Sequence, residues 1–345
     1  MTMFKDVTLF IPTHNRHNYL KRILEYYNDV PLDVLVADSS TTPFATDDLN
    51  SRVTYLHLPG ERLSQKLYIA LSKVKTEFVV MCADDDFTLP DGIVQCVNFL
   101  KNNPDYSVAH GNSIAYAKES MREKYTPFSV MYIDQLAFEI ADEDPLERLE
   151  QLFDPYRTLF CAIHYTRNLQ LAYNKDFNFE NLFLSEYPPG IIDLCAGKFK
   201  ELPVLFQVRE NAPDSGDKVT ANLDVIALDE KYAGEYQKYL SYITDAATAV
   251  MPVDRSVFLA RLNVIFKRYA TQLKIYKQES GKGPFLKKKI GSLIFHIPFI
   301  GRKVIMNNRD RVRKNQLTLA VKTSADKANL DKIENLIKKY AATIK

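Results

Sequence analysis

Short apolar runs, each followed by a polar turn, characterise the amino-terminal part of the chain. Four of them can be recognised, at 7–12, 33–40, 53–58 and 78–83. Apolar residues at helical spacing occur between them and after the last one. Continuous apolar runs are typical of strands buried on both faces, and their alternation with helices predicts a mostly parallel, right-handed α/β sheet.

Three consecutive aspartates, Asp84, Asp85 and Asp86, follow the fourth run directly. Thr88 is expected to cap the next helix, with Pro90 in its first turn. Adjacent carboxylates raise one another's proton affinity unless a cation compensates them, and Mg²⁺ or Mn²⁺ prefers such oxygen ligands. The plainer alternative is an acidic turn that only precedes a helix.

Ligands of parallel α/β sheets bind beyond the carboxyl ends of the strands. Residues 13–16, 38–40 and 84–86 all follow apolar runs, so we expect them to meet in one cleft. A polar loop follows the last expected strand, at 199–208, and Arg209 at its start is expected to face the phosphates of a ligand. Lys66 would add positive charge near these phosphates, although a solvated helix face explains it equally well.

Composition narrows the class of protein. The formal charge of the 345 residues is +2, which gives no overall signature of nucleic-acid binding. The four cysteines lie in apolar sequence without CxxC spacing, which indicates reduced core residues and a cytoplasmic protein. We see neither a signal-peptide pattern nor an apolar run long enough to cross a bilayer.

Glycine-rich phosphate-binding motifs are missing: the sequence has neither GxGxxG after its first run nor GxxxxGK[ST]. Instead FIPTHNR, VADSS and the acidic DDD resemble the nucleotide-binding half of a GT-A glycosyltransferase of the family-2 type. The longer stretch from SQKLYIALSKVKTEFVVMCADDDF through FLKNNPDYSVAHGNSIAY resembles a bacterial subgroup used in surface-polysaccharide assembly. The resemblance covers about residues 5–210 and implies a Rossmann-like sheet.

The resemblance also implies roles for residues of the cleft. Asp86 would bind the metal directly, Asp84 would contact the ribose or metal-bound water, and Asp38 would contact the base or ribose. The complete set expected to bind a nucleotide-sugar donor is Pro12, Thr13, Arg16, Asp38, Lys66, Asp84, Asp85 and Arg209, with Asp86 and Asp84 on Mg²⁺ or Mn²⁺.

A further carboxylate is needed near the acceptor, because inverting sugar transfer requires a base to take the proton of the acceptor hydroxyl. In related enzymes this base lies at the amino end of a helix after the acceptor loop, and Glu186 is the closest match. The usual Glu-Asp pair is absent, since Tyr187 follows Glu186. Asp193 is the alternative base, and His110 and His164 are expected to be core residues.

The carboxyl third has a different character. We expect a catalytic domain at 1–215 and an α-helical appendage at 216–345, with helices near 224–250, 255–277 and 325–342. Between them, segment 281–314 carries ten Lys or Arg against the single Asp310. It is expected to dock on the anionic inner face of the cytoplasmic membrane. A linker packed on the helices and a groove for an anionic polysaccharide are the alternatives.

These patterns and the resemblance favour a metal-dependent, inverting glycosyltransferase. It would move a sugar from a nucleoside-diphosphate donor to a glycan or lipid-linked acceptor, in bacterial surface polysaccharide biosynthesis. Two other hypotheses stay open at this point. One is a nucleotidyltransferase, which also uses a parallel sheet with metal-binding carboxylates. The other is a non-catalytic binding protein on a degenerate transferase scaffold.

Overall fold

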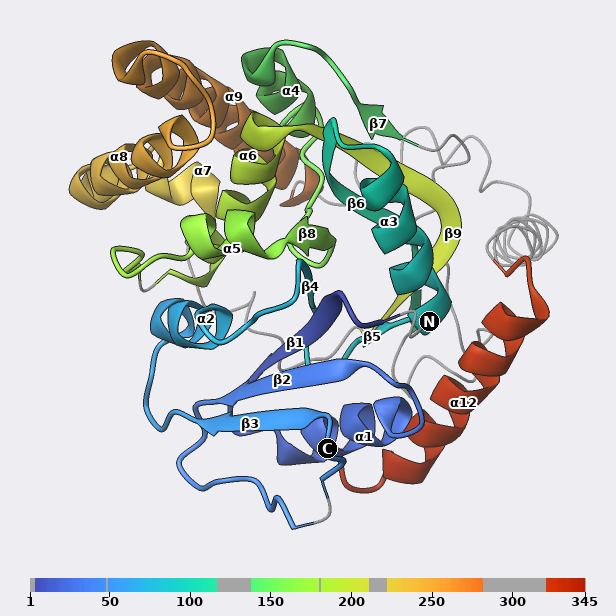
Figure 1. Cartoon of the computed structure of the whole chain (residues 1–345). Helices are drawn as coiled ribbons and strands as arrows, with labels where there is room; N and C mark the ends of the chain where they lie inside the picture. Colours follow the sequence, from blue (N-terminus) through green and yellow to red (C-terminus); the bar gives the residue numbers. More distant parts are fainter. Residues whose placement is uncertain are drawn as a thin grey trace, which may run out of the picture.

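A nine-stranded sheet lies between two layers of helices (Figure 1). The computed structural model describes residues 4–47, 49–116, 138–179, 181–210, 222–281 and 321–344. The strand order is β3-β2-β1-β4-β8-β6-β9-β5, and β7 pairs with β9 beside this path. Two expected features lie outside these residues: the loop after Arg209 and nearly all of the basic segment 281–314.

The sheet is mostly parallel, as the apolar runs predicted. Its long strands run in one direction: β1 (Val7–Thr13), β2 (Asp33–Asp38), β3 (Val53–His57), β4 (Phe78–Met81), β6 (Tyr106–Tyr116) and β9 (Lys198–Glu210). The short strands β5 (Phe87–Thr88), β7 (Glu139–Ile140) and β8 (Ile163–Tyr165) run antiparallel to them. Thr13 is in register with Asp38, and Asp38 with His57, so these strand ends lie at one edge of the sheet.

Alternate residues of the central strands enter two separate cores. In β1, Phe10 belongs to one core and Leu9 and Ile11 to the other, as expected for strands covered on both faces. The first core contains helices α2 (Leu63–Leu71), α4 (Pro145–Leu152), α5 (Thr166–Ala172), α6 (Tyr187–Ala196), α7 (Leu223–Ile226), α8 (Ala233–Thr248) and α9 (Arg255–Gly281). The second contains α1 (His17–Tyr27), α3 (Pro90–Asn102) and α12 (Ser324–Tyr340).

The carboxyl third is helical as expected, but its helices form no core of their own. Helices α7 to α9 share the first core with α4, α5 and α6, and α12 packs on α1 in the second core (Figure 1). Tyr26 of α1 donates a hydrogen bond to Asn329 of α12 at 3.0 Å. The helix expected near 224–250 is divided into α7, a 3₁₀ turn (Glu230–Tyr232) and α8.

One local expectation was wrong. Thr88 does not cap α3: it lies in β5, paired with Gln207 of β9, and Leu89 precedes the helix without a side-chain cap. Strand β8 begins at Ile163 and pairs with both β4 and β6. In the described part of the chain, no helix is long and apolar enough to cross a membrane.

Candidate active site

The acidic turn after β4 contacts the end of β1 and the polar turn after it, as predicted for residues that follow neighbouring parallel strands. Asp84 accepts hydrogen bonds from Thr13 Oγ1 and Arg16 Nη1, both at 2.6 Å. Asp85 Oδ2 accepts from Arg16 Nη2 at 2.8 Å. Asn15, between Thr13 and Arg16, has a positive φ of 54°, a conformation that asparagine tolerates better than most residues. One guanidinium thus joins two carboxylates of the turn to the polar turn after β1.

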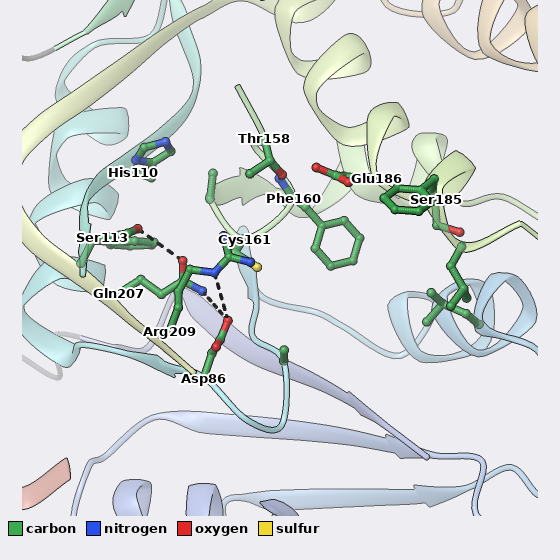
Figure 2. A pocket seen from close by; sticks show the side chains of 16 residues that line it. Asp86, His110, Ser113, Thr158, Phe160, Cys161, Ser185, Glu186, Gln207 and Arg209 are labelled. Carbon is green, nitrogen blue, oxygen red and sulfur yellow. Dashed lines mark hydrogen bonds and ion pairs between the residues drawn. The ribbon is translucent and has the colours of Figure 1, made fainter. Parts of the chain in front are cut away.

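Asp86 points to the other side, toward β9. Its Oδ1 accepts the Glu210 backbone N–H at 2.9 Å, and its Oδ2 accepts from Gln207 Nε2 at 3.2 Å. Arg209 Nε lies 3.6 Å from Oδ2, an ion pair drawn in Figure 2. Arg209 is therefore next to the acidic turn, as expected for a cation near the phosphates of a donor.

The electrostatics of the turn favour an additional cation. Burial raises the pKa of Asp84 to about 7, more than Arg16 lowers it, and Asp85 adds to the rise. Burial and Asp85 likewise raise the pKa of Asp86 to about 7, against the opposite effect of Arg209. Arg16, Lys66 and Arg209 therefore compensate these buried carboxylates incompletely.

The carboxylates of the acidic turn are ligand types that suit a divalent cation. Within the described residues, no three His, Cys, Asp or Glu side chains gather closely enough to hold a metal ion. Mg²⁺ in phosphate-processing sites commonly uses one or two carboxylates together with water and substrate phosphates. Asp86 faces the cavity and Asp84 faces Thr13 and Arg16, so the turn supplies carboxylates for a cation shared with a diphosphate and does not form a closed protein site.

Asp38 lies at the end of β2 and is fully buried. It accepts hydrogen bonds from Tyr55 at 2.8 Å, from His17 at 2.9 Å and from the N–H and hydroxyl of Ser40. Burial opposes ionisation, but these bonds hold the pKa of Asp38 below its ordinary value. Phe44 packs on both His17 and Tyr55, with ring centroids 5.5 and 6.4 Å away. Sequence reasoning missed this ring cluster, whose members stand in unremarkable positions of a loop, a helix and a strand.

Lys66 is buried below the strand ends and is not a solvated residue. Its Nζ donates to the Thr13 carbonyl at 2.6 Å and to Ser39 Oγ at 3.0 Å. Burial lowers the pKa of Lys66 to about 8, although Asp84 and Asp38 act in the opposite direction. It therefore joins the ends of β1 and β2. Pro12, paired with Ala37 in the same register, is only partly buried.

A cavity of about 450 Å³ opens beside Asp86. Figure 2 shows Asp86, Gln207 and Arg209 on one side of it and Glu186 on the opposite side. Glu186 immediately precedes α6, whose first turn contains two prolines. The other labelled lining residues are His110, Ser113, Thr158, Phe160, Cys161 and Ser185.

The two carboxylates expected near the acceptor differ in environment. Asp193 does not line the cavity: it is fully buried in α6, where it accepts from His164 Nδ1 at 2.6 Å and from Asn168 at 2.8 Å. A carboxylate enclosed by these partners cannot reach an acceptor hydroxyl, so the geometry disfavours Asp193 as a base. Glu186 alone of the two faces the cavity.

His110 was expected in the core, and only His164 lies there fully buried. His110 lines the cavity, with Nδ1 2.7 Å from the Gly111 carbonyl oxygen and its ring 5.1 Å from that of Phe199. Since a carbonyl oxygen only accepts, Nδ1 carries the proton and Nε2 is an acceptor. Burial lowers the pKa of His110 to about 4, so the ring is neutral at physiological pH.

Comparison with known proteins gives a family match for part of the chain. Residues 8–166 match the family described as Glycosyl transferase family 2. The match includes Thr13, Arg16, Asp38, Lys66 and the acidic turn, whereas Glu186 and Arg209 lie beyond it. A search of curated protein sequences finds no match.

Two similar solved structures are of S. aureus TarS 1-349. The complex with UDP-GlcNAc is 14% identical, with a TM-score of 0.49 over 98% of this chain and 92% of that chain. A second structure of the same fragment is 15% identical, with a TM-score of 0.41 over 79% of this chain and 91% of that chain.

Proposed function

We propose that the chain, whose residues 8–166 match the model of Glycosyl transferase family 2, transfers a sugar from a nucleoside-diphosphate donor to an acceptor hydroxyl, with inversion and with the help of Mg²⁺ or Mn²⁺. One observation carries the proposal. Asp86, the last carboxylate of the buried acidic turn, and the carboxylate of Glu186 line the same cavity from opposite sides. Such an arrangement provides for a leaving diphosphate at one end and for proton removal at the other.

The donor end would be formed by the strand-end residues. Asp84 and Asp86 would hold the divalent cation, which when bound supplies positive charge to a departing diphosphate. Arg209 lies next to Asp86 and would face the same phosphates. Thr13, Arg16 and Asp85 form the hydrogen-bonded floor of this end, and Lys66 supports it from below. Pro12 and Asp38 would lie on the nucleoside side.

The acceptor end would depend on Glu186. As the bond forms between the acceptor oxygen and the anomeric carbon, the bond from that carbon to the diphosphate breaks, and Glu186 takes the hydroxyl proton. Attack on the face opposite the leaving diphosphate inverts the configuration. Neutral His110, with Nε2 as an acceptor, would orient a hydroxyl in the same cavity.

The acceptor class is inferred from the sequence. Segment 281–314 has basic clusters on both sides of an apolar stretch, which supports contact with an anionic membrane surface and a lipid-linked or glycan acceptor in surface-polysaccharide assembly. The site would then work at the inner face of the cytoplasmic membrane. Vesicle co-sedimentation tests this: binding that is equal for anionic and neutral vesicles at low salt would contradict it.

The activity itself can be tested with a panel of nucleotide sugars. The protein is incubated with each donor and Mn²⁺ or Mg²⁺, and release of nucleoside diphosphate is measured with and without EDTA. We expect one donor to be cleaved much faster than the others and EDTA to abolish the reaction. Full turnover in EDTA would refute metal dependence, and an α-linked product from an α-linked donor would refute inversion.

A further inference from the structure

The turn that carries Glu186 is held by two buried tyrosine hydroxyls. This 3₁₀ turn, η2, spans Leu182–Ser185 and ends one residue before Glu186. Tyr239 donates its hydroxyl to the Leu184 carbonyl at 2.8 Å, and Tyr173 donates to the Ser185 carbonyl at 2.5 Å. Both tyrosines are fully buried. Each bond therefore lies away from water, where a lost partner is costly.

The peptide unit between Ser185 and Glu186 is fixed at both of its polar groups. Its carbonyl accepts from Tyr173, and its N–H, that of Glu186, donates to the Phe183 carbonyl at 3.1 Å. Burial raises the pKa of both phenols far above the ordinary value, so they remain protonated donors. The backbone from which the Glu186 side chain extends is thus fixed in orientation.

The two tyrosines belong to different parts of the chain, both well after the acidic turn in the sequence. Tyr173 follows α5 directly, and Tyr239 lies in α8, in the carboxyl-terminal helical region (Figure 1). Edge-to-face aromatic contacts hold both rings. The ring centroids of Phe177 and Tyr173 are 5.2 Å apart, and those of Phe179 and Tyr239 are 5.1 Å apart. An aromatic side chain with two rotatable bonds, packed this tightly, holds its hydroxyl in one place.

We propose that Tyr173 and Tyr239 are positioning residues that set the Glu186 carboxylate in reach of the acceptor hydroxyl. The proposal rests on the proposed role of Glu186 as the base. It assigns to α8 a part in catalysis without contact with substrate. Proton transfer depends steeply on geometry, and a displacement of about 1 Å can cost about 10²-fold in rate.

A control exists on the same helix. Tyr236 is also buried in α8, but it donates its hydroxyl to Asn263 Oδ1 at 2.9 Å and not to the turn before Glu186. We expect Tyr239→Phe to lower kcat about 10- to 100-fold with donor KM nearly unchanged. Tyr236→Phe should keep kcat within about twofold, while both variants lose similar thermal stability.

A double-mutant cycle with Glu186→Gln completes the test. If the Tyr239 hydroxyl acts through Glu186, Tyr239→Phe should change the residual rate of Glu186→Gln by less than about twofold. Tyr173→Phe should behave in the same way. An equal kcat for Tyr239→Phe and Tyr236→Phe, or an equal loss from Tyr239→Phe in the wild-type and Glu186→Gln backgrounds, would overturn the positioning role.

The cycle also separates this inference from the proposed function. Full turnover of Glu186→Gln would refute Glu186 as the base and with it the positioning role. A Glu186→Gln variant that loses turnover, beside a fully active Tyr239→Phe, would refute the positioning role alone.

Discussion

Lys66 is a buried cation under the candidate active site. Its replacement by methionine tests how much the burial of this charge lowers the free energy of unfolding. The unfolded chain would titrate near the ordinary lysine pKa of 10.5, whereas burial lowers the pKa of Lys66 to about 8 in the folded state. The difference corresponds to about 3 kcal/mol against folding at pH 7. Methionine keeps the length of the side chain and removes this cost.

Methionine also removes two hydrogen bonds, to the Thr13 carbonyl and to Ser39 Oγ, worth about 1 kcal/mol each. The Thr13 carbonyl still accepts from the Ser39 N–H at 3.2 Å, so it is not left without a partner. We therefore expect Lys66→Met to be about 1 kcal/mol more stable than wild type at pH 7.

The sign of the stability difference between Lys66→Met and wild type reverses at high pH. Between pH 8 and 10.5 the unfolded state binds the Lys66 proton and the folded state does not, so wild-type stability gains as the pH rises. By pH 10 the burial cost has fallen to about 1 kcal/mol, and Lys66→Met should be about 1 kcal/mol less stable than wild type.

Urea denaturation followed by far-ultraviolet circular dichroism at pH 7, 9 and 10 measures this difference. The contributions of titrating groups that do not interact with Lys66 cancel between variant and wild type. Lys66 lowers the pKa of Asp84, so its loss raises that pKa and acts in the same direction as the expected change. Lys73→Met, which replaces an exposed lysine just after α2, is the control and should show the same small difference at every pH. A Lys66→Met difference that does not change between pH 7 and 10 would refute the argument.

Three further substitutions test the site. Asp86→Asn should lower the transfer rate at least about 10²- to 10³-fold and abolish stabilisation by Mn²⁺ in thermal shift assays. Asp91→Asn, on the exposed first turn of α3, is the control and should be neutral. An active Asp86→Asn variant would exclude Asp86 as a metal ligand. Asp193→Asn should cost about 2 kcal/mol of stability and change kcat less than about fivefold, and the opposite pattern would restore Asp193 as the base. Gly111→Ala should lower the free energy of unfolding by about 2 kcal/mol, because its Cβ would lie 2.5 Å from the Val204 carbonyl oxygen of β9. Gly234→Ala is the control in urea denaturation, since its Cβ would meet no atom within 4 Å. Equal stabilities of the two variants would refute the close contact.

The sequence by itself determined the layout of the amino-terminal half of the sheet. Apolar runs of strand length predicted the four parallel strands, because strands covered on both faces need apolar residues at every position. Parallel strands place their carboxyl ends at one edge, and this rule alone predicted that Thr13 and Arg16 lie near the acidic turn. The resemblance to family-2 glycosyltransferases rests on the same residues.

Only the tertiary structure distinguished residues of the same chemical type. Glu186 and Asp193 are carboxylates in one short stretch, and nothing in the local pattern shows that β8 supplies His164 to enclose Asp193. Thr88 follows the pattern of a helix cap, but pairing with a strand about 120 residues later takes it into the sheet. Local periodicity carries no information on such distant partners.

The carboxyl-terminal helices show the same limit. The helical spacing of their apolar residues predicted these helices correctly, but such spacing does not say which surface the apolar side of a helix will cover. In the structure α8 packs against α6 and donates the Tyr239 hydroxyl to the turn before Glu186, while α12 packs on α1 at the other face of the sheet. Contacts between residues so far apart in the chain form only when the whole core closes, and they decide how the carboxyl third takes part in the site.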